Sequence, residues 1–158
     1  MRRQDREVTD KKKMMEIIKK GKYAVIALCS DNDPYIVTLN YGFDELTNTF
    51  YFHGADKGQK IDLIKANPNA SLMIIEDLGY QYGHCSHAYR SVVCRGKMTL
   101  IDHPEERVHG IEVMIHQLEP RPEGQLARIR DTDVIWRRTQ IFKLAVESMT
   151  GKERPEIE

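Results

Sequence analysis

The chain has 158 residues, and its 24 Lys and Arg balance its 24 Asp and Glu. A balanced charge argues against a nucleic-acid binder, which needs a basic excess or a basic stripe. Three cysteines at unpatterned spacings, Cys29, Cys85 and Cys94, argue against a disulfide framework and for a reducing compartment. The sequence has no secretory leader and no apolar run long enough to span a bilayer, so we expect a cytoplasmic protein with no membrane partner.

The first third of the chain predicts one helix and three strands. A helix capped near Asp10 is expected to end at Gly21. Residues 23–29 are a short apolar run with β-branched content, which predicts a strand buried on both faces. Residues 31–34 predict a turn after it. Residues 35–41 alternate in character, and residues 49–53 follow after a polar turn, so these two strands are expected to form a hairpin.

The middle of the chain predicts a helix between strands. Residues 59–67 have helical character, and residues 70–76 predict a strand. Residues 78–87 are polar and are expected to be irregular. Residues 89–101 predict a strand in which Gly96 marks a bulge or a close backbone approach.

The last third predicts a helix, a loop and a final strand. The helix is expected to begin within residues 102–105, where a capping residue precedes a proline. Residues 119–124 read as a loop and residues 140–147 as the last strand. Because parallel βαβ repetition is absent, we expect a mainly β fold, a β-barrel with flanking helices, as a single domain over residues 1–158. Its ends, 1–9 and 152–158, are expected to be flexible.

One segment carries a chemical signal, a strand ending at His53 that leads through a loop into a helix. Unpaired N–H groups at a helix start attract phosphate, and Gly54 and Gly58 let the backbone come close to it. Lys57 and Lys60 add positive charge, and His53 can add a hydrogen bond. The spacing matches neither the nucleotide-hydrolase nor the dinucleotide pattern. An ordinary loop with two surface lysines stays open as the alternative.

The strand over residues 35–41 suggests what such a phosphate belongs to. Thr38 and Asn40 place hydrogen-bonding groups on one face of an otherwise apolar strand. A flat amphipathic ring such as isoalloxazine needs an apolar platform with a few donors and acceptors along its edge. The two segments together favour a flavin site.

The order and spacing of several segments resemble the FMN-binding split-barrel family, which includes pyridoxamine 5'-phosphate oxidase and the nitroimidazole-resistance reductases. The resemblance spans nearly the whole chain and lies closest to the nitroimidazole-reductase branch. The matching segments are residues 3–10, 21–28, 34–42, 51–62, 91–96 and 146–152.

The resemblance implies a split β-barrel that binds FMN, with the strand at Ile36–Tyr41 under the ring and the segment His53–Lys60 around the phosphate. It also implies that Ser91 reaches the flavin from a second subunit and that Trp136 borders the ring. The expected cofactor-binding residues are Ile36, Val37, Thr38, Leu39, Asn40, His53, Gly54, Ala55, Lys57, Gly58, Lys60, Ser91 and Trp136.

The family resemblance also bears on activity. The oxidase pairs an Arg with a His near its C-terminus, and this chain has no such pair after Trp136. We therefore expect an FMN-dependent reductase of small electrophiles such as nitroaromatics, supplied by a nicotinamide or another electron donor, rather than a pyridoxamine phosphate oxidase. A shallow barrel encloses a flavin poorly, which favours a homodimer with FMN at the interface. A non-catalytic flavin- or haem-binding protein and a structural dimer with an empty site are the alternatives.

The segment His84-Cys-Ser-His87, with Cys94 nearby in sequence, raises the question of a metal site. Zinc ligands usually come as two well-spaced pairs, so this compact run predicts no metal. A nucleophilic Cys85 would need a base that points at it, which sequence neighbours rarely do. We expect a polar loop or a lining of the space above the flavin.

Overall fold

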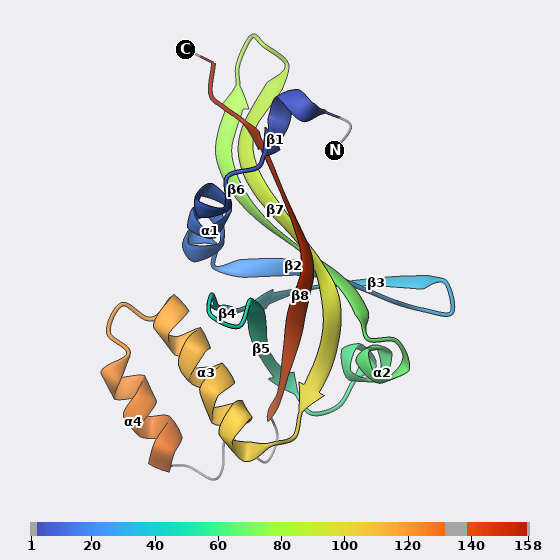
Figure 1. The fold of residues 1–158 in the computed structure, drawn as a ribbon, viewed down its shortest axis with the longest axis vertical. Helices are drawn as coiled ribbons and strands as arrows, with labels where there is room; N and C mark the ends of the chain where they lie inside the picture. Colours follow the sequence, from blue (N-terminus) through green and yellow to red (C-terminus); the bar gives the residue numbers. More distant parts are fainter. Residues whose placement is uncertain (1–2, 132–138, 158) are drawn as a thin grey trace.

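The computed structural model describes residues 3–131 and 139–157, and Trp136 lies outside them (Figure 1). A short 3-10 turn, η1 (Gln4–Arg6), precedes the regular elements. The strands are β1 (Glu7–Val8), β2 (Tyr23–Ser30), β3 (Asp33–Asn40), β4 (Gly42–Asp44), β5 (Thr49–Ala55), β6 (Asn69–Gln81), β7 (Ser86–Ile101) and β8 (Thr139–Arg154). The helices are α1 (Lys11–Lys20), α2 (Gln59–Ala66), α3 (Pro104–Leu118) and α4 (Glu123–Asp131). Among the described residues, no helix is both long and apolar enough to cross a bilayer.

All strand pairs are antiparallel, in one sheet of order β3-β2-β6-β7-β8-β5-β4 with β1 added to β8. The long strands β6, β7 and β8 are shared by a curled barrel half and a projecting β6–β7 hairpin (Figure 1). Helices α3 and α4 lie on one side of the strands and α2 on the other. This confirms the expected mainly β barrel with flanking helices and the absence of a doubly wound sheet.

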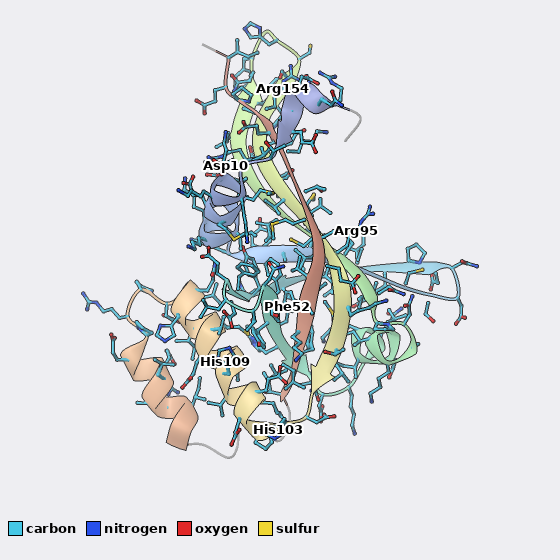
Figure 2. The ribbon with its side chains drawn as sticks, in the orientation of Figure 1. Asp10, Phe52, Arg95, His103, His109 and Arg154 are labelled. Atoms are coloured by element: carbon cyan, nitrogen blue, oxygen red, sulfur yellow. The ribbon has the colours of Figure 1, made fainter. Side chains whose placement is uncertain are left out.

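Aromatic rings fill the centre of the barrel. Phe52 is fully buried, with its ring centroid 5.6 Å from Phe142 and 6.3 Å from Phe50. Tyr41 is also fully buried, and its hydroxyl donates to the carbonyl of Ile18 at 2.6 Å. Figure 2 shows Phe52 in this half and Arg154 at the projecting end. The buried Tyr41 hydroxyl is therefore satisfied within a core of large rings.

Several local predictions are confirmed. The Asp10 side chain accepts from the Lys12 N–H at 2.8 Å and caps α1, which ends before Gly21. The turn between β2 and β3 has only two residues, Asp31 and Asn32, and both have positive φ. That is the backbone of a type I′ hairpin, which Asn and Asp tolerate.

Gly96 sits at a bulge, as predicted. The β7–β8 register shifts between Arg95 and Gly96. A Cβ built on Gly96 would lie 1.8 Å from the carbonyl oxygen of Ala145. The two backbones can approach this closely only because residue 96 has no side chain.

The predicted hairpin between residues 35–41 and 49–53 is wrong. Strand β3 pairs with β2, whereas β5 pairs with β4 and β8. The chain leaves β3 at Tyr41, whose side chain turns into the core, and β4 starts at the opposite edge of the sheet.

Three other expectations need correction. Strand β2 is buried on one face only in this chain, since Tyr23 is 54% exposed while Ala24 is fully buried. The segment 78–87 is not irregular, because β6 and β7 continue through most of it as a hairpin. Part of each end is paired, because β8 continues to Arg154 and Lys152 pairs with Glu7.

The loop expected after α3 is also shorter than predicted. Helix α4 begins at Glu123 and was not foreseen from the sequence. Its polar composition gives only a weak helical pattern, so its placement against α3 depends on tertiary packing.

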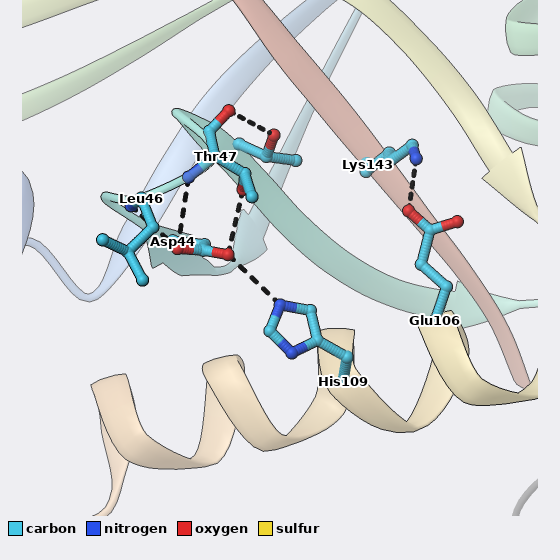
Figure 3. Close-up of polar contacts among 7 residues, drawn as sticks. Asp44, Leu46, Thr47, Glu106, His109 and Lys143 are labelled. Atoms are coloured by element: carbon cyan, nitrogen blue, oxygen red, sulfur yellow. Dashed lines mark hydrogen bonds and ion pairs between the residues drawn. The ribbon is translucent and has the colours of Figure 1, made fainter.

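Polar contacts fasten α3 to the sheet (Figure 3). His109 Nε2 lies 3.2 Å from Asp44 Oδ2, and Glu106 pairs with Lys143 on β8. Asp44 also accepts from the Thr47 hydroxyl at 2.9 Å and from the Leu46 N–H at 2.9 Å. Burial opposes the charged form of Asp44, but these hydrogen bonds outweigh it and hold the pKa of the carboxyl below its usual value.

We expect the Asp44 contribution to stability to depend on pH. Because the folded-state pKa of Asp44 is lowered, its contribution is present above about pH 4 and is lost as the pH falls through the folded-state value. Asp44→Asn should cost about 1–2 kcal/mol in the free energy of unfolding at pH 7. Urea unfolding of both proteins at pH 7 and pH 3 checks this, and an equal difference at the two pH values would contradict it.

Candidate functional site

The phosphate-like segment joins the end of β5 to the start of α2. Gly58 precedes the helix with φ 117° and ψ 171°, a conformation that favours glycine. Its carbonyl accepts from the N–H of Ile61 at 2.9 Å. Among the described residues no side chain caps this helix end, so the N–H groups of its first turn that do not bond the Gly58 carbonyl are left for an anion.

Lys60 folds back over β5 at Gly54. A Cβ on Gly54 would lie 2.7 Å from Cε of Lys60 and 3.0 Å from its ammonium nitrogen. The missing side chain therefore makes room for Lys60 against the strand. Among the described residues neither Lys57 nor Lys60 has an ion-pair partner, although Asp56 is adjacent in sequence. The structure thus places Lys60 against Gly54 next to the helix start, while Lys57 is exposed in the loop before Gly58.

His53 does not join this group. It precedes Gly54 on β5, so its side chain points to the opposite face of the strand. There it lines a cavity of about 410 Å³ with apolar residues of α3 and α4, including Ile111 and Met114. Desolvation there lowers the pKa of His53, which favours the neutral imidazole near pH 7. The predicted hydrogen bond from His53 to a phosphate is therefore not supported. Ala55, two residues on, lies exposed at the end of β5.

Strand β3 divides its side chains between two faces, as predicted. Val37 and Leu39 are partly buried against the core, whereas Ile36, Thr38 and Asn40 are exposed. The Asn40 amide donates to the carbonyl of Lys22 at 2.7 Å. Only the exposed side chains are open to a ring. Val37 and Leu39 face the core, so only their backbone atoms could contact a flavin.

Ser91 lies on the same sheet face as the exposed residues of β3. It is 7% exposed and pairs directly with Ile75 of β6. Directly paired residues project to one side of a sheet, so Ser91 and Ile75 share this face. Asn40 of β3 pairs directly with Tyr23 of β2, so these two residues also share a sheet face.

A second hollow lies on that face and was not foreseen from the sequence. It has about 400 Å³ and is lined by Tyr23, Ile75, Asp77, His87 and Tyr89. His87 Nε2 lies 2.6 Å from Asp77 Oδ1. The signal that could have found it is the two-residue spacing of Ile75 and Asp77 on one strand and of His87 and Tyr89 on the next. The polar composition of residues 78–87 predicts an irregular segment, and so conceals that the two strands continue as a hairpin.

The possible metal ligands are not brought together. Cys94 is fully buried in the core, while Cys85 is exposed in the hairpin turn with φ 46°. Over residues 3–131 and 139–157, no group of three or more His, Cys, Asp or Glu side chains could hold a metal ion.

The curled antiparallel sheet with helices at its edges is the split-barrel architecture. A sequence profile of the pyridoxamine 5'-phosphate oxidase family matches residues 10–153. The chain belongs to this family.

Several solved structures share this fold, at different levels of sequence identity. A candidate 5-nitroimidazole antibiotic resistance protein of Bacteroides thetaiotaomicron superposes with a TM-score of 0.76 at 27% identity, covering 93% of this chain and 86% of that one. A flavocytochrome of Azotobacter vinelandii superposes with a TM-score of 0.79 at 16% identity, covering 100% and 74%. An FAD- and heme-binding protein of Mycobacterium smegmatis gives 0.78 at 15%, covering 97% and 76%. The last two show the fold alone.

One curated sequence is also similar, an uncharacterized protein of Rhizobium meliloti. It is 31% identical over 90 residues, which are 57% of this chain and 54% of that protein. The match therefore spans about half the length of this relative.

Proposed function

We propose that this chain binds FMN and, as a homodimer, reduces small electrophiles such as nitroaromatics. The observation that carries the proposal is Lys60 lying over Gly54, beside the uncapped start of α2. Backbone N–H groups and two ammonium groups with no ion-pair partner among the described residues suit a doubly charged phosphate within one short segment.

The residues present fit the rest of the cofactor. The ring would lie along the exposed face of β3, where Ile36 offers apolar surface and Thr38 and Asn40 offer hydrogen-bonding groups. A bound flavin supplies two-electron chemistry, and the chain holds, orients and shields it. The phosphate end would anchor the cofactor through Gly58 and Lys60.

A second copy would complete the site. The sheet face that carries Ser91 also exposes large apolar side chains, with Ile36 68% and Ile75 46% exposed. Large exposed apolar side chains on one sheet face are typical of an interface rather than of solvent-facing sheet. A two-fold partner would cover the ring and bring its own copy of Ser91 to it.

The nitroaromatic class is supported by the 27% identical resistance protein, whose described association is with 5-nitroimidazole antibiotics. The test is anaerobic. Protein with bound FMN is reduced by NADPH or NADH and then mixed with 2-nitroimidazole, and the flavin absorbance is followed. We expect reduction by one of the nicotinamides and rapid reoxidation by the nitro compound. Bound flavin that neither step changes would contradict the reductase assignment.

A non-catalytic flavin or haem carrier is the second candidate. It is favoured by solved structures of the same fold whose descriptions include a flavocytochrome and an FAD- and heme-binding protein. Adding haem and recording the Soret band separates the two. A sharp Soret band at near-stoichiometric haem, with inert flavin, would support the carrier.

A further inference from the structure

The hollow on the outer sheet face has the character of a small aromatic site. Its walls are the ring of Tyr23, the side chain of Ile75 and the ring of Tyr89, and its volume is about 400 Å³. Tyr23 is 54% exposed and Ile75 46% exposed, so the apolar walls of the hollow are accessible in the single chain. Apolar walls with few polar groups are the usual lining of a site for a planar ligand.

The polar side of this hollow is a histidine held by a carboxylate. His87 donates from Nε2 to Asp77 Oδ1 at 2.6 Å, and Asp77 also accepts from the Gly79 N–H at 2.8 Å. The His87 ring lies edge-on to Tyr80 at 6.1 Å between centroids. Because the carboxylate occupies Nε2, the second nitrogen, Nδ1, is left to exchange a proton with a ligand.

Strand pairing places this hollow beside the proposed flavin positions. Tyr23 pairs directly with Asn40, and Ile75 pairs directly with Ser91. The hollow therefore lies between the ring platform of β3 and the residue expected to approach a flavin from a second copy. Because this is also the face that a second copy would cover, a ligand in the hollow would be enclosed between the two copies.

We propose that this hollow receives the planar electron acceptor and that His87, positioned by Asp77, donates a proton to it. The inference rests on the proposed function. In the reaction, the nitro group would gain a hydride (two electrons and one proton) from the bound reduced flavin, and His87 would supply the second proton. One N–O bond breaks, the oxygen leaves as water, a nitroso compound forms, and the imidazole regains its proton from solvent.

The test separates proton-dependent from proton-independent reoxidation. Protein carrying reduced FMN is mixed anaerobically with 2-nitroimidazole or with ferricyanide, which accepts electrons without a proton. We expect His87→Gln to slow reoxidation by the nitro compound about 100-fold, the lower range for a lost general acid, and to leave the ferricyanide rate unchanged. His116→Gln, an exposed histidine on α3, is the matched control and should change neither rate.

Binding gives a readout that does not depend on turnover. 2-Nitroimidazole is titrated into the oxidised protein and followed by NMR of the histidine rings. We expect Ile75→Ala to weaken binding about tenfold, and Asp77→Asn to slow reoxidation by the nitro compound. Equal nitro reoxidation rates in wild type and His87→Gln, or binding unaffected by Ile75→Ala, would overturn this inference alone. Failure to bind FMN, or wild-type flavin that ferricyanide reoxidises and 2-nitroimidazole does not, would overturn the proposed reductase with it.

Discussion

Replacing Lys57 and Lys60 together by alanine should weaken FMN binding about 100-fold, which corresponds to about 2.7 kcal/mol. Charge-assisted hydrogen bonds contribute about 1.5–3 kcal/mol each, and the exposure of Lys57 reduces its share. Titration of the apoprotein with FMN, followed by quenching of flavin fluorescence, measures the change. The two lysines have no ion-pair partner among the described residues, so the thermal unfolding midpoint should change little.

Lys65→Ala is the matched control for this double variant. Lys65 is exposed in the last turn of the same helix, away from Gly58. It removes a positive charge from α2 without touching the helix start, so FMN affinity should stay within about twofold of wild type. Equal FMN affinity in wild type and the double variant would refute the phosphate assignment. An equal loss of affinity in Lys65→Ala and in the double variant would show only a long-range effect of charge.

Gly96→Ala should destabilise the fold by about 3–5 kcal/mol or prevent folding. The new Cβ would meet the Ala145 carbonyl oxygen at 1.8 Å and its carbon at 2.9 Å. Both atoms belong to the backbone of β8, so no side-chain rotation relieves the clash and the bulge must open. Since domains of this size are stable by only about 5–15 kcal/mol, the loss is large. Urea unfolding followed by circular dichroism measures it.

Gly124→Ala is the control for this substitution. Gly124 lies in the first turn of α4, and a Cβ there would meet nothing within 4 Å. Alanine has a higher helix propensity than glycine, so stability should be unchanged or rise by up to about 1 kcal/mol. A Gly96→Ala protein as stable as this control would show that β7 and β8 do not approach as described.

Local patterns were sufficient where the deciding interactions are local. The cap at Asp10, the two-residue turn at Asp31 and the bulge at Gly96 each depend on the conformational preferences of one or two residues. The alternation of β3 also follows from a period of two residues. For that reason the exposed positions Thr38 and Asn40 could be read from the sequence.

Strand pairing could not be read in the same way, because it is decided by distant residues. The expected hairpin failed at Tyr41, whose hydroxyl reaches the carbonyl of Ile18 and turns the chain away from β3. The apolar run in β2 also gave a wrong expectation, since Tyr23 faces outward while Ala24 is buried. A sequence does not distinguish a buried core residue from an exposed apolar one. The surroundings of His53 likewise depend on the position of α3, which no local pattern gives.

The candidate site was therefore predicted in one half and missed in the other. The glycines and lysines around Gly58 are close in sequence and stay close in space. The hollow at His87 combines β2, β6 and β7, and Asp77 reaches His87 only because the hairpin continues past residue 78. Sites assembled across strands require the register, which sequence periodicity does not supply.

The most direct test of flavin binding is an absorbance spectrum of the freshly purified protein, repeated after FMN is added and the excess removed. The account predicts flavin bands near 1:1 occupancy that survive removal of free FMN, and their loss in the Lys57 and Lys60 double variant. A colourless protein that retains no FMN after this treatment would contradict it.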